Sequence, residues 1–265
     1  MECGPNSAAT PEAVVRCAYC SEVVDSPEEE HVFPESWYPD GTLPSTMLTV
    51  PSCRSCNGSI ERVEVRICRS LVMGVHPDNT AAKGVQERVF NSMNWLRAKG
   101  KTEADRKKDA RVRDGVWKKF KRSTRIVPAN EPIAAFPTSR PPRSYMAQNE
   151  AGLWIRGRGI VSYDPADLDR ITEKFVRGVY YFQTKTPLKP EVPIATPLLP
   201  GDPWETALDL IDRANLHPHV VSPAFVYWGC DVTDDSPQTS LWLFLVWNEY
   251  VLCGMTGGFA NPAQR

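Results

Sequence analysis

The sequence predicts a mixed α+β fold. Residues 1–73 carry two Cys-x-x-Cys pairs, between which lie two short β segments, and a helical pattern follows the second pair. Residues 74–126 are basic with helical periodicity, and residues 151–265 end in apolar segments typical of strands. We therefore expect a metal-clamped ββα core, a basic helical arm, a proline-rich linker over residues 127–150, and a C-terminal α+β domain with an antiparallel hairpin or small sheet.

The cysteine pairs predict a structural zinc site. Two thiolates separated by two residues fit adjacent corners of a tetrahedron around Zn²⁺, and the ligands would be Cys17, Cys20, Cys53 and Cys56. A dithiol redox site or a disulfide framework can use the same motif, but two copies without a secretory signal favour zinc. The remaining cysteines are expected to include ordinary buried thiols: Cys3, Cys68, Cys230 and Cys253.

The segment between the cysteine pairs carries the ββ part of the core. Residues 31–33 read as a short β segment that Pro34 ends, residues 35–45 have loop chemistry, and residues 47–50 read as the second strand. A helix is predicted over residues 57–73. Its apolar positions recur at three- and four-residue steps, at Ile60, Val63, Ile67 and Leu71.

Two short motifs accompany the cysteines. Glu30-His31-Val32-x-Pro34 lies between the pairs, and Asn57 directly follows the last cysteine. Together with the zinc ligands, this pattern resembles the HNH endonuclease superfamily, in the branch whose ββα-metal core is clamped by four cysteines, and it covers residues 14–70. The resemblance implies that Glu30 binds a catalytic divalent metal, that His31 is the general base, and that Asn57 is a second metal ligand.

The chain departs from the family at two places. Many members have Asp where this chain has Glu30, and the middle Asn of the family has no counterpart in residues 46–50. Further down the helix, Glu61 falls one turn after Asn57 and Glu64 a further turn on. Either carboxylate can complete the metal shell, or both lie on a solvated helix face.

The residue types suit phosphodiester hydrolysis independently of the family. The reaction needs a nucleophilic water, a cation that neutralises phosphate charge, and help for the leaving alkoxide. A neutral His can take the proton from water. One carboxylate and one amide oxygen leave Mg²⁺ or Mn²⁺ with open positions for phosphate and water, whereas zinc would supply rigidity.

The charge is unevenly distributed along the chain. The net charge is −1, yet residues 71–145 hold seventeen Lys and Arg against seven Asp and Glu. Helices are predicted over residues 80–98 and after a capping box at Thr102-x-x-Asp105. Such a basic run is usually a solvated helix face, but beside a candidate nuclease core we expect it to hold DNA. The expected phosphate contacts are Lys107, Lys108, Arg111, Lys118, Lys119 and Arg122.

The C-terminal part has no catalytic signature. A strand is expected over residues 152–163, helices over 164–181 and 204–215, and an antiparallel hairpin over 225–232 and 240–247 with a third strand at 250–255. His217 and His219 are assigned to a loop. The domain can serve as a surface for a homodimer or a partner protein.

Three functions are compatible with the sequence. The first is a metal-dependent DNA endonuclease, the second a zinc-stabilised nucleic-acid-binding module that does not cut, and the third an interaction protein. Stand-alone members of the resembled family serve in restriction, phage defence and mobile elements. The first ten residues lack a signal-peptide pattern and no apolar run has membrane length, so we expect no membrane partner and a cytoplasmic location.

Overall fold

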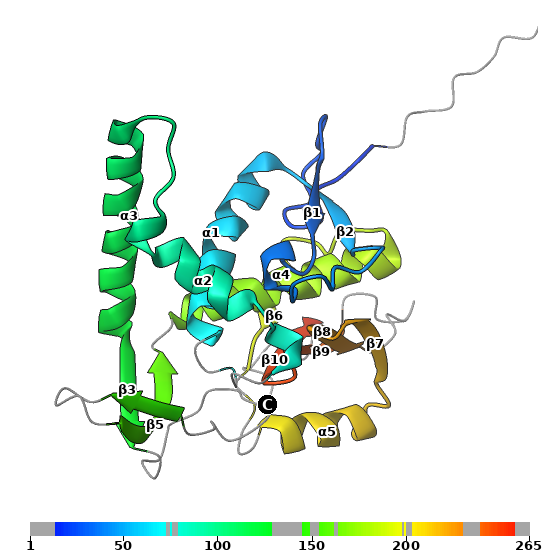
Figure 1. Cartoon of the computed structure of the whole chain (residues 1–265). Coiled ribbons are helices and arrows are strands. Elements are labelled where there is room, and N and C mark those ends of the chain that lie inside the picture. The colour runs from blue at the N-terminus through cyan, green and yellow to red at the C-terminus, as the bar shows by residue number, and fades with distance from the viewer. Residues whose placement is uncertain are drawn as a thin grey trace, which may run out of the picture.

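A computed structural model describes most of the chain (Figure 1). The described residues are 14–72, 75, 79–128, 145–148, 154–161, 164–197, 199, 203–229 and 239–257. The fold is α+β, with three antiparallel sheets of two, three and five strands among these residues.

The N-terminal unit is a β-hairpin followed by a helix. Strand β1 (Glu28–His31) pairs antiparallel with β2 (Thr49–Ser52), with Glu30 opposite Val50 and His31 opposite Thr49. Helix α1 (Arg54–Leu71) follows directly. It begins three residues before the predicted start because Cys53 caps it, its sulfur accepting the backbone N–H of Cys56 at 3.4 Å.

The first half of the basic arm consists of several short helical elements, whereas its periodicity predicts one helix. In place of one helix over 80–98 there are a 3-10 turn at Thr80–Ala82, helix α2 (Val85–Met93), and another 3-10 turn at Trp95–Arg97. Gly84 has a φ of +79°, which an L side chain adopts only with strain, so the chain cannot stay helical there. The predicted single helix was therefore wrong.

Helix α3 (Glu103–Ser123) is the long helix of the arm and runs along one side of the molecule (Figure 1). The predicted capping box is confirmed. The backbone N–H of Asp105 donates to Thr102 Oγ1 at 3.1 Å, and the N–H of Thr102 donates to Asp105 Oδ2 at 3.2 Å.

A three-stranded sheet follows α3. Strands β3 (Thr124–Pro128), β4 (Tyr145–Gln148) and β5 (Trp154–Val161) are arranged in the order β3-β5-β4. Only β5 was anticipated, as the strand over 152–163. The last residues of β3 and all of β4 lie near the two ends of the predicted linker, residues 127–150, and both strands pair with β5. Residues 129–144 lie outside the described part.

The C-terminal sheet has five strands. They are β6 (Ile194–Ala195), β7 (His217–Ser222), β8 (Phe225–Gly229), β9 (Leu241–Val246) and β10 (Tyr250–Thr256), in the order β6-β10-β9-β8-β7. The predicted hairpin and third strand are confirmed. The loop assignment of His217 and His219 was wrong, because both lie in the edge strand β7, where His219 stacks on Tyr227.

Two helices cover the two faces of this sheet. Helix α4 (Pro165–Thr184) begins where it was predicted and is capped by Asp164, and α5 (Pro203–Arg213) lies on the opposite side (Figure 1). Every residue of β9 is buried because its side chains enter two clusters in alternation: Trp242, Phe244 and Val246 on the α4 side, and Leu241, Leu243 and Leu245 on the α5 side.

Helix α4 lies between the sheet and the ββα unit. A Cβ at Gly254 of β10 would come within 2.4 Å of a methyl group of Val176 of α4. On the other side of α4, Phe175 packs against Phe33 with ring centroids 4.9 Å apart. The N-terminal and C-terminal parts therefore share one hydrophobic core, and α4 can carry side chains into the ββα unit.

No helix within the described residues is both long and apolar enough to span a bilayer.

Candidate functional site: a four-cysteine cluster beside an acidic cleft

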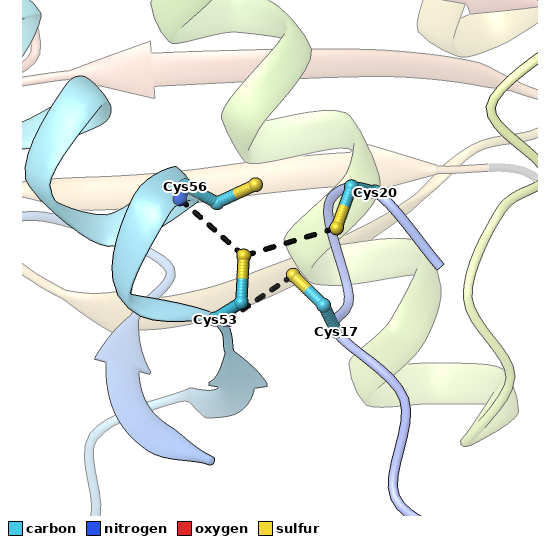
Figure 2. A group of neighbouring side chains, drawn as sticks. All are labelled: Cys17, Cys20, Cys53 and Cys56. Carbon is cyan, nitrogen blue, oxygen red and sulfur yellow. Dashed lines mark hydrogen bonds between the residues drawn. The ribbon is translucent and has the colours of Figure 1, made fainter. Parts of the chain in front are cut away.

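The four predicted zinc ligands converge. The ligand atoms of Cys17, Cys20, Cys53 and Cys56 all lie within 4.8 Å of one another. Figure 2 shows two of them on the loop before β1 and two at the start of α1. The sulfurs of Cys20 and Cys53 are 3.8 Å apart, well beyond the roughly 2.05 Å of a disulfide. The arrangement favours a metal centre over a disulfide framework.

Backbone N–H groups surround the sulfurs. The N–H groups of Tyr19 and Cys53 donate to Cys17 Sγ at 3.4 Å and 3.3 Å. Burial raises the pKa of Cys17, but these backbone donors outweigh it and lower the pKa to about 7. The pKa values of Cys20 and Cys56 are raised, chiefly by burial. The Cys17 thiol therefore loses its proton readily. Deprotonating all four thiols requires a cation among the sulfurs to compensate the negative charge.

The donor set fits structural zinc. Four cysteine sulfurs on two Cys-x-x-Cys turns match the chemistry and the spacing of closed tetrahedral sites. Two of the other cysteines, Cys68 and Cys253, are buried and free, and burial raises the pKa of each to about 12. These two are inert core thiols, as expected, whereas Cys3 and Cys230 lie outside the described residues.

A cleft of about 620 Å³ lies beside the cysteine cluster. Its lining includes five residues named from the sequence and one that was not: Glu30, His31, Asn57, Glu61, Glu64 and Arg88. The first two come from β1. The next three follow each other on α1 at spacings of four and three residues, so they share one face of that helix. Pairing of β1 with β2, and capping of α1 by Cys53, bring the two groups to the same cleft.

His31 has an orphaned ring nitrogen. Its Nδ1 is buried and has no hydrogen-bond partner within the described residues. Leaving a buried polar atom unpaired costs about 1–3 kcal/mol. Other atoms of the His31 side chain or backbone line the cleft, since the residue is part of its wall. The imidazole therefore lies at the end of β1 with one ring nitrogen unpaired within the described residues.

Asn57 is oriented by a neighbouring carboxylate. Its Nδ2 donates to Glu28 Oε2 at 2.8 Å, which links α1 to β1. Because the amide nitrogen is committed to Glu28, the carbonyl oxygen Oδ1 is left as the free acceptor, and no hydrogen bond to it forms within the described residues. The predicted ligand atom is available.

Arg88 also lines the cleft. It pairs with Asp40, and its Nη2 donates to the backbone oxygens of Tyr38 at 2.5 Å and Ser36 at 3.2 Å. Its pKa is lowered by burial. These contacts tie α2 to the loop after β1.

Two of the cleft carboxylates contact a buried lysine that sequence reasoning missed. Lys174 of α4 donates from Nζ to Glu30 Oε1 at 2.6 Å and also to Glu64 Oε1. Its side chain is fully buried, at 0% exposure. The pKa of Glu64 is raised, chiefly by burial, although the neighbouring ammonium lowers it. One oxygen of Glu30, the predicted metal ligand, is therefore committed to an internal cation.

The basic arm presents one unpaired face. Lys107 pairs with Glu103 at 2.6 Å, and Lys118 pairs with Asp114 at 2.7 Å. Within the described side chains, the exposed residues Lys108, Arg111 and Lys119 form no ion pair. The side chain of Arg122 lies outside the described part.

The unpaired residues share one helix face. Along α3, Lys108, Arg111, Gly115 and Lys119 follow one another at steps of three or four residues. Residues with this spacing lie on the same face of a helix. A Cβ at Gly115 would meet nothing within 4 Å, so this face of α3 is open.

The fold and the cysteine cluster define the class as an α+β protein with a potential structural metal centre. Comparison of the chain with protein-family models, curated proteins and solved structures finds no match. The chemistry of the cleft is therefore the basis for assigning a function.

Proposed function

We propose that this chain is a metal-dependent endonuclease of the HNH type that hydrolyses DNA phosphodiester bonds. The observation that carries the proposal is the meeting of Glu30, His31 and Asn57 in one cleft beside the four cysteines. His31 is the general base that takes a proton from the attacking water. Glu30 and Asn57 hold the catalytic divalent metal.

The donor atoms suit a hard cation. The hydrogen bonds that these two side chains form within the described residues use Oε1 of Glu30 and Nδ2 of Asn57. Oε2 of Glu30 and Oδ1 of Asn57 are therefore left as ligand atoms. A carboxylate and an amide oxygen are ligands typical of Mg²⁺ and Mn²⁺, and two protein ligands leave positions for water and phosphate. Glu61 lines the same cleft and is exposed, so it remains a weaker third ligand.

Each group has a separate part in the chemistry. A divalent metal held there would neutralise the phosphate and assist the leaving oxygen. His31 lines the cleft and supplies the imidazole nitrogen that takes the proton from water. The zinc on the cysteines would hold the turn before β1 against the start of α1, which fixes the two elements that carry the site.

DNA affinity must come from outside the cleft. The cleft walls carry Glu30, Glu61 and Glu64, which repel a polyanion in the absence of metal. The open face of α3 with Lys108, Arg111 and Lys119 is the proposed phosphate-binding surface. A reducing cytoplasm suits the thiolates of the metal centre.

A second candidate is a DNA-binding module that does not cut. It is favoured by the commitment of one Glu30 oxygen to Lys174, which reduces the negative charge available to a metal. Both candidates need zinc and both bind DNA. Cleavage alone separates them.

The test is conversion of supercoiled plasmid to nicked and linear forms with Mg²⁺ or Mn²⁺. The parent is compared with His31→Ala and with His219→Ala, which removes a histidine stacked on Tyr227 in the C-terminal sheet. We expect metal-dependent cutting by the parent and by His219→Ala, and none by His31→Ala. Zinc content is measured in each sample, because a chelator strong enough to remove Mg²⁺ can also strip the cysteines.

Either alternative outcome is informative. Cutting that survives His31→Ala means that the base is assigned wrongly or that the preparation contains another nuclease. DNA binding without cutting in either metal, by zinc-loaded folded protein, supports the binding module.

A further inference from the structure

Lys174 is an unusual residue for its position. It lies on α4 within the buried face that also carries Ile171 and Phe175, and its side chain is fully buried. A lysine almost never reaches this degree of burial without a partner. Here the partners are two carboxylates from the ββα unit, Glu30 on β1 and Glu64 on α1.

The geometry is that of a cation held by two carboxylates. Nζ contacts Oε1 of Glu30 and Oε1 of Glu64 at the same time. Two carboxylate oxygens that converge on one point are also what a divalent metal requires. The ammonium therefore occupies the point at which these two side chains would otherwise bind a metal ion.

We propose that Lys174 acts as a built-in cation between Glu30 and Glu64. It excludes divalent metal from that position and leaves the metal only Oε2 of Glu30 together with Oδ1 of Asn57. The inference rests on the proposed nuclease function and deepens it, because it assigns Lys174 as a positioning residue for the catalytic metal. Lys174 does not itself touch the substrate.

The connectivity supports this assignment. Lys174 lies on α4 and follows Glu30 by 144 residues and Glu64 by 110 residues in the sequence. Glu30 and Glu64 both line the cleft, so the ammonium lies at the inner side of the proposed site. A second link between the same helices, Arg66 to Asp167, lies at the first turn of α4 and already fastens α1 to α4 outside the cleft.

The test is direct Mn²⁺ binding to zinc-loaded, full-length protein without DNA, measured by electron paramagnetic resonance. Lys174→Met keeps an unbranched side chain that is one atom shorter and removes its charge. We expect this variant to bind one more Mn²⁺ per chain than the parent, because both carboxylates become free. The affinity for this ion should be on the order of tenfold or more above the affinity of the parent at the same carboxylates. Lys174→Met with Glu64→Gln removes one of the two carboxylates and should lose the gain.

Folding is followed in the same samples. Removing Lys174 leaves two buried carboxylates uncompensated, so the variant should unfold at lower temperature than the parent. If Mn²⁺ takes the place of the ammonium, it should raise the unfolding temperature of Lys174→Met more than that of the parent. The double variant should show no such increase.

Several results would overturn the inference. They are unchanged Mn²⁺ binding in Lys174→Met, equal gains in the single and double variants, or unfolding of Lys174→Met that Mn²⁺ does not reverse. Failure of the proposed function looks different. A parent that neither binds Mn²⁺ nor cuts plasmid refutes the nuclease, whereas a Mn²⁺ site that appears in Lys174→Met would still identify the lysine as a resident cation.

Discussion

Gly178 of α4 lies against Val32, the residue that follows His31, and a Cβ at Gly178 would come within 2.9 Å of both methyl groups of Val32. The contact brings the backbone of α4 close to the end of β1. This close approach fits the reach of Lys174, one turn earlier on α4, to Glu30 on the same strand.

The first prediction concerns this contact. Gly178→Ala should lower the free energy of unfolding by roughly 1–3 kcal/mol, because overpacking outweighs the gain of up to about 1 kcal/mol in helix propensity. Chemical denaturation measures the change. Val32→Ala removes the opposing methyl groups, so combining it with Gly178→Ala should cost less than the sum of the single changes. Strict additivity of the two would mean that the residues do not touch.

Much of this architecture follows from local pattern. The apolar spacing of α4, the apolar runs of β8 and β9, and the Cys-x-x-Cys pairs predict elements that the structure contains. Each of these signals is contained within a short stretch of chain. The break at Gly84 was missed because a glycine inside a helical pattern does not reveal its φ.

The arrangement of the candidate site could be predicted only in part. The motif around His31 and Asn57 indicated which residues meet, and they do line one cleft. Lys174 was missed because its burial depends on carboxylates more than a hundred residues away. A charged residue three positions after Ile171, within an apolar stripe, was the one signal in the sequence, but periodicity does not say which element covers a helix face.

The second prediction concerns the metal centre. Cys20→Ser should lower the bound zinc below the one ion per chain expected for the single cluster, and should lower the unfolding temperature, because metal binding contributes directly to folding. Zinc is measured by a colorimetric chelator after denaturation. Cys253→Ala is the matched control, since it removes a buried thiol outside the cluster. Loss of zinc in that control would contradict the assignment.

The third prediction concerns pH. Arg66 donates to Asp167 through Nε at 2.6 Å and Nη2 at 2.5 Å. These hydrogen bonds lower the pKa of Asp167 below its usual value of 3.8. A carboxylate whose pKa is lower in the folded state stabilises the fold above its unfolded pKa, and that contribution is lost as the pH falls through the folded pKa.

Asp167→Asn should therefore cost about 1 kcal/mol of unfolding free energy at pH 7, a modest value because half of the Arg66 side chain is exposed. The difference between parent and variant should shrink as the pH falls below 3.8. Urea titrations over a range of pH values measure both quantities. A cost that stays constant into the acid range would show that the ion pair is not its source.

The fourth prediction concerns DNA binding by α3. Changing Lys108, Arg111 and Lys119 together to Gln should weaken binding to any duplex and reduce the slope of log K against log salt by roughly 0.9 for each phosphate that the variant no longer neutralises. These residues are chosen because they share the open face on which Gly115 leaves space for a backbone to approach. Fluorescence anisotropy at several salt concentrations measures affinity and slope together.

A second triple variant tests whether the loss of DNA affinity comes from the face of α3 or from the total charge of the protein. Changing Lys83, Lys185 and Lys189 to Gln removes three positive charges from exposed positions outside α3. If α3 is the phosphate-binding surface, this control should leave the salt slope unchanged, because screened charges more than about 10 Å from the DNA contribute little at 0.1 M salt. An equal loss of affinity in both triple variants would mean that DNA responds to the overall charge of the protein, and the open face of α3 would then have no specific role.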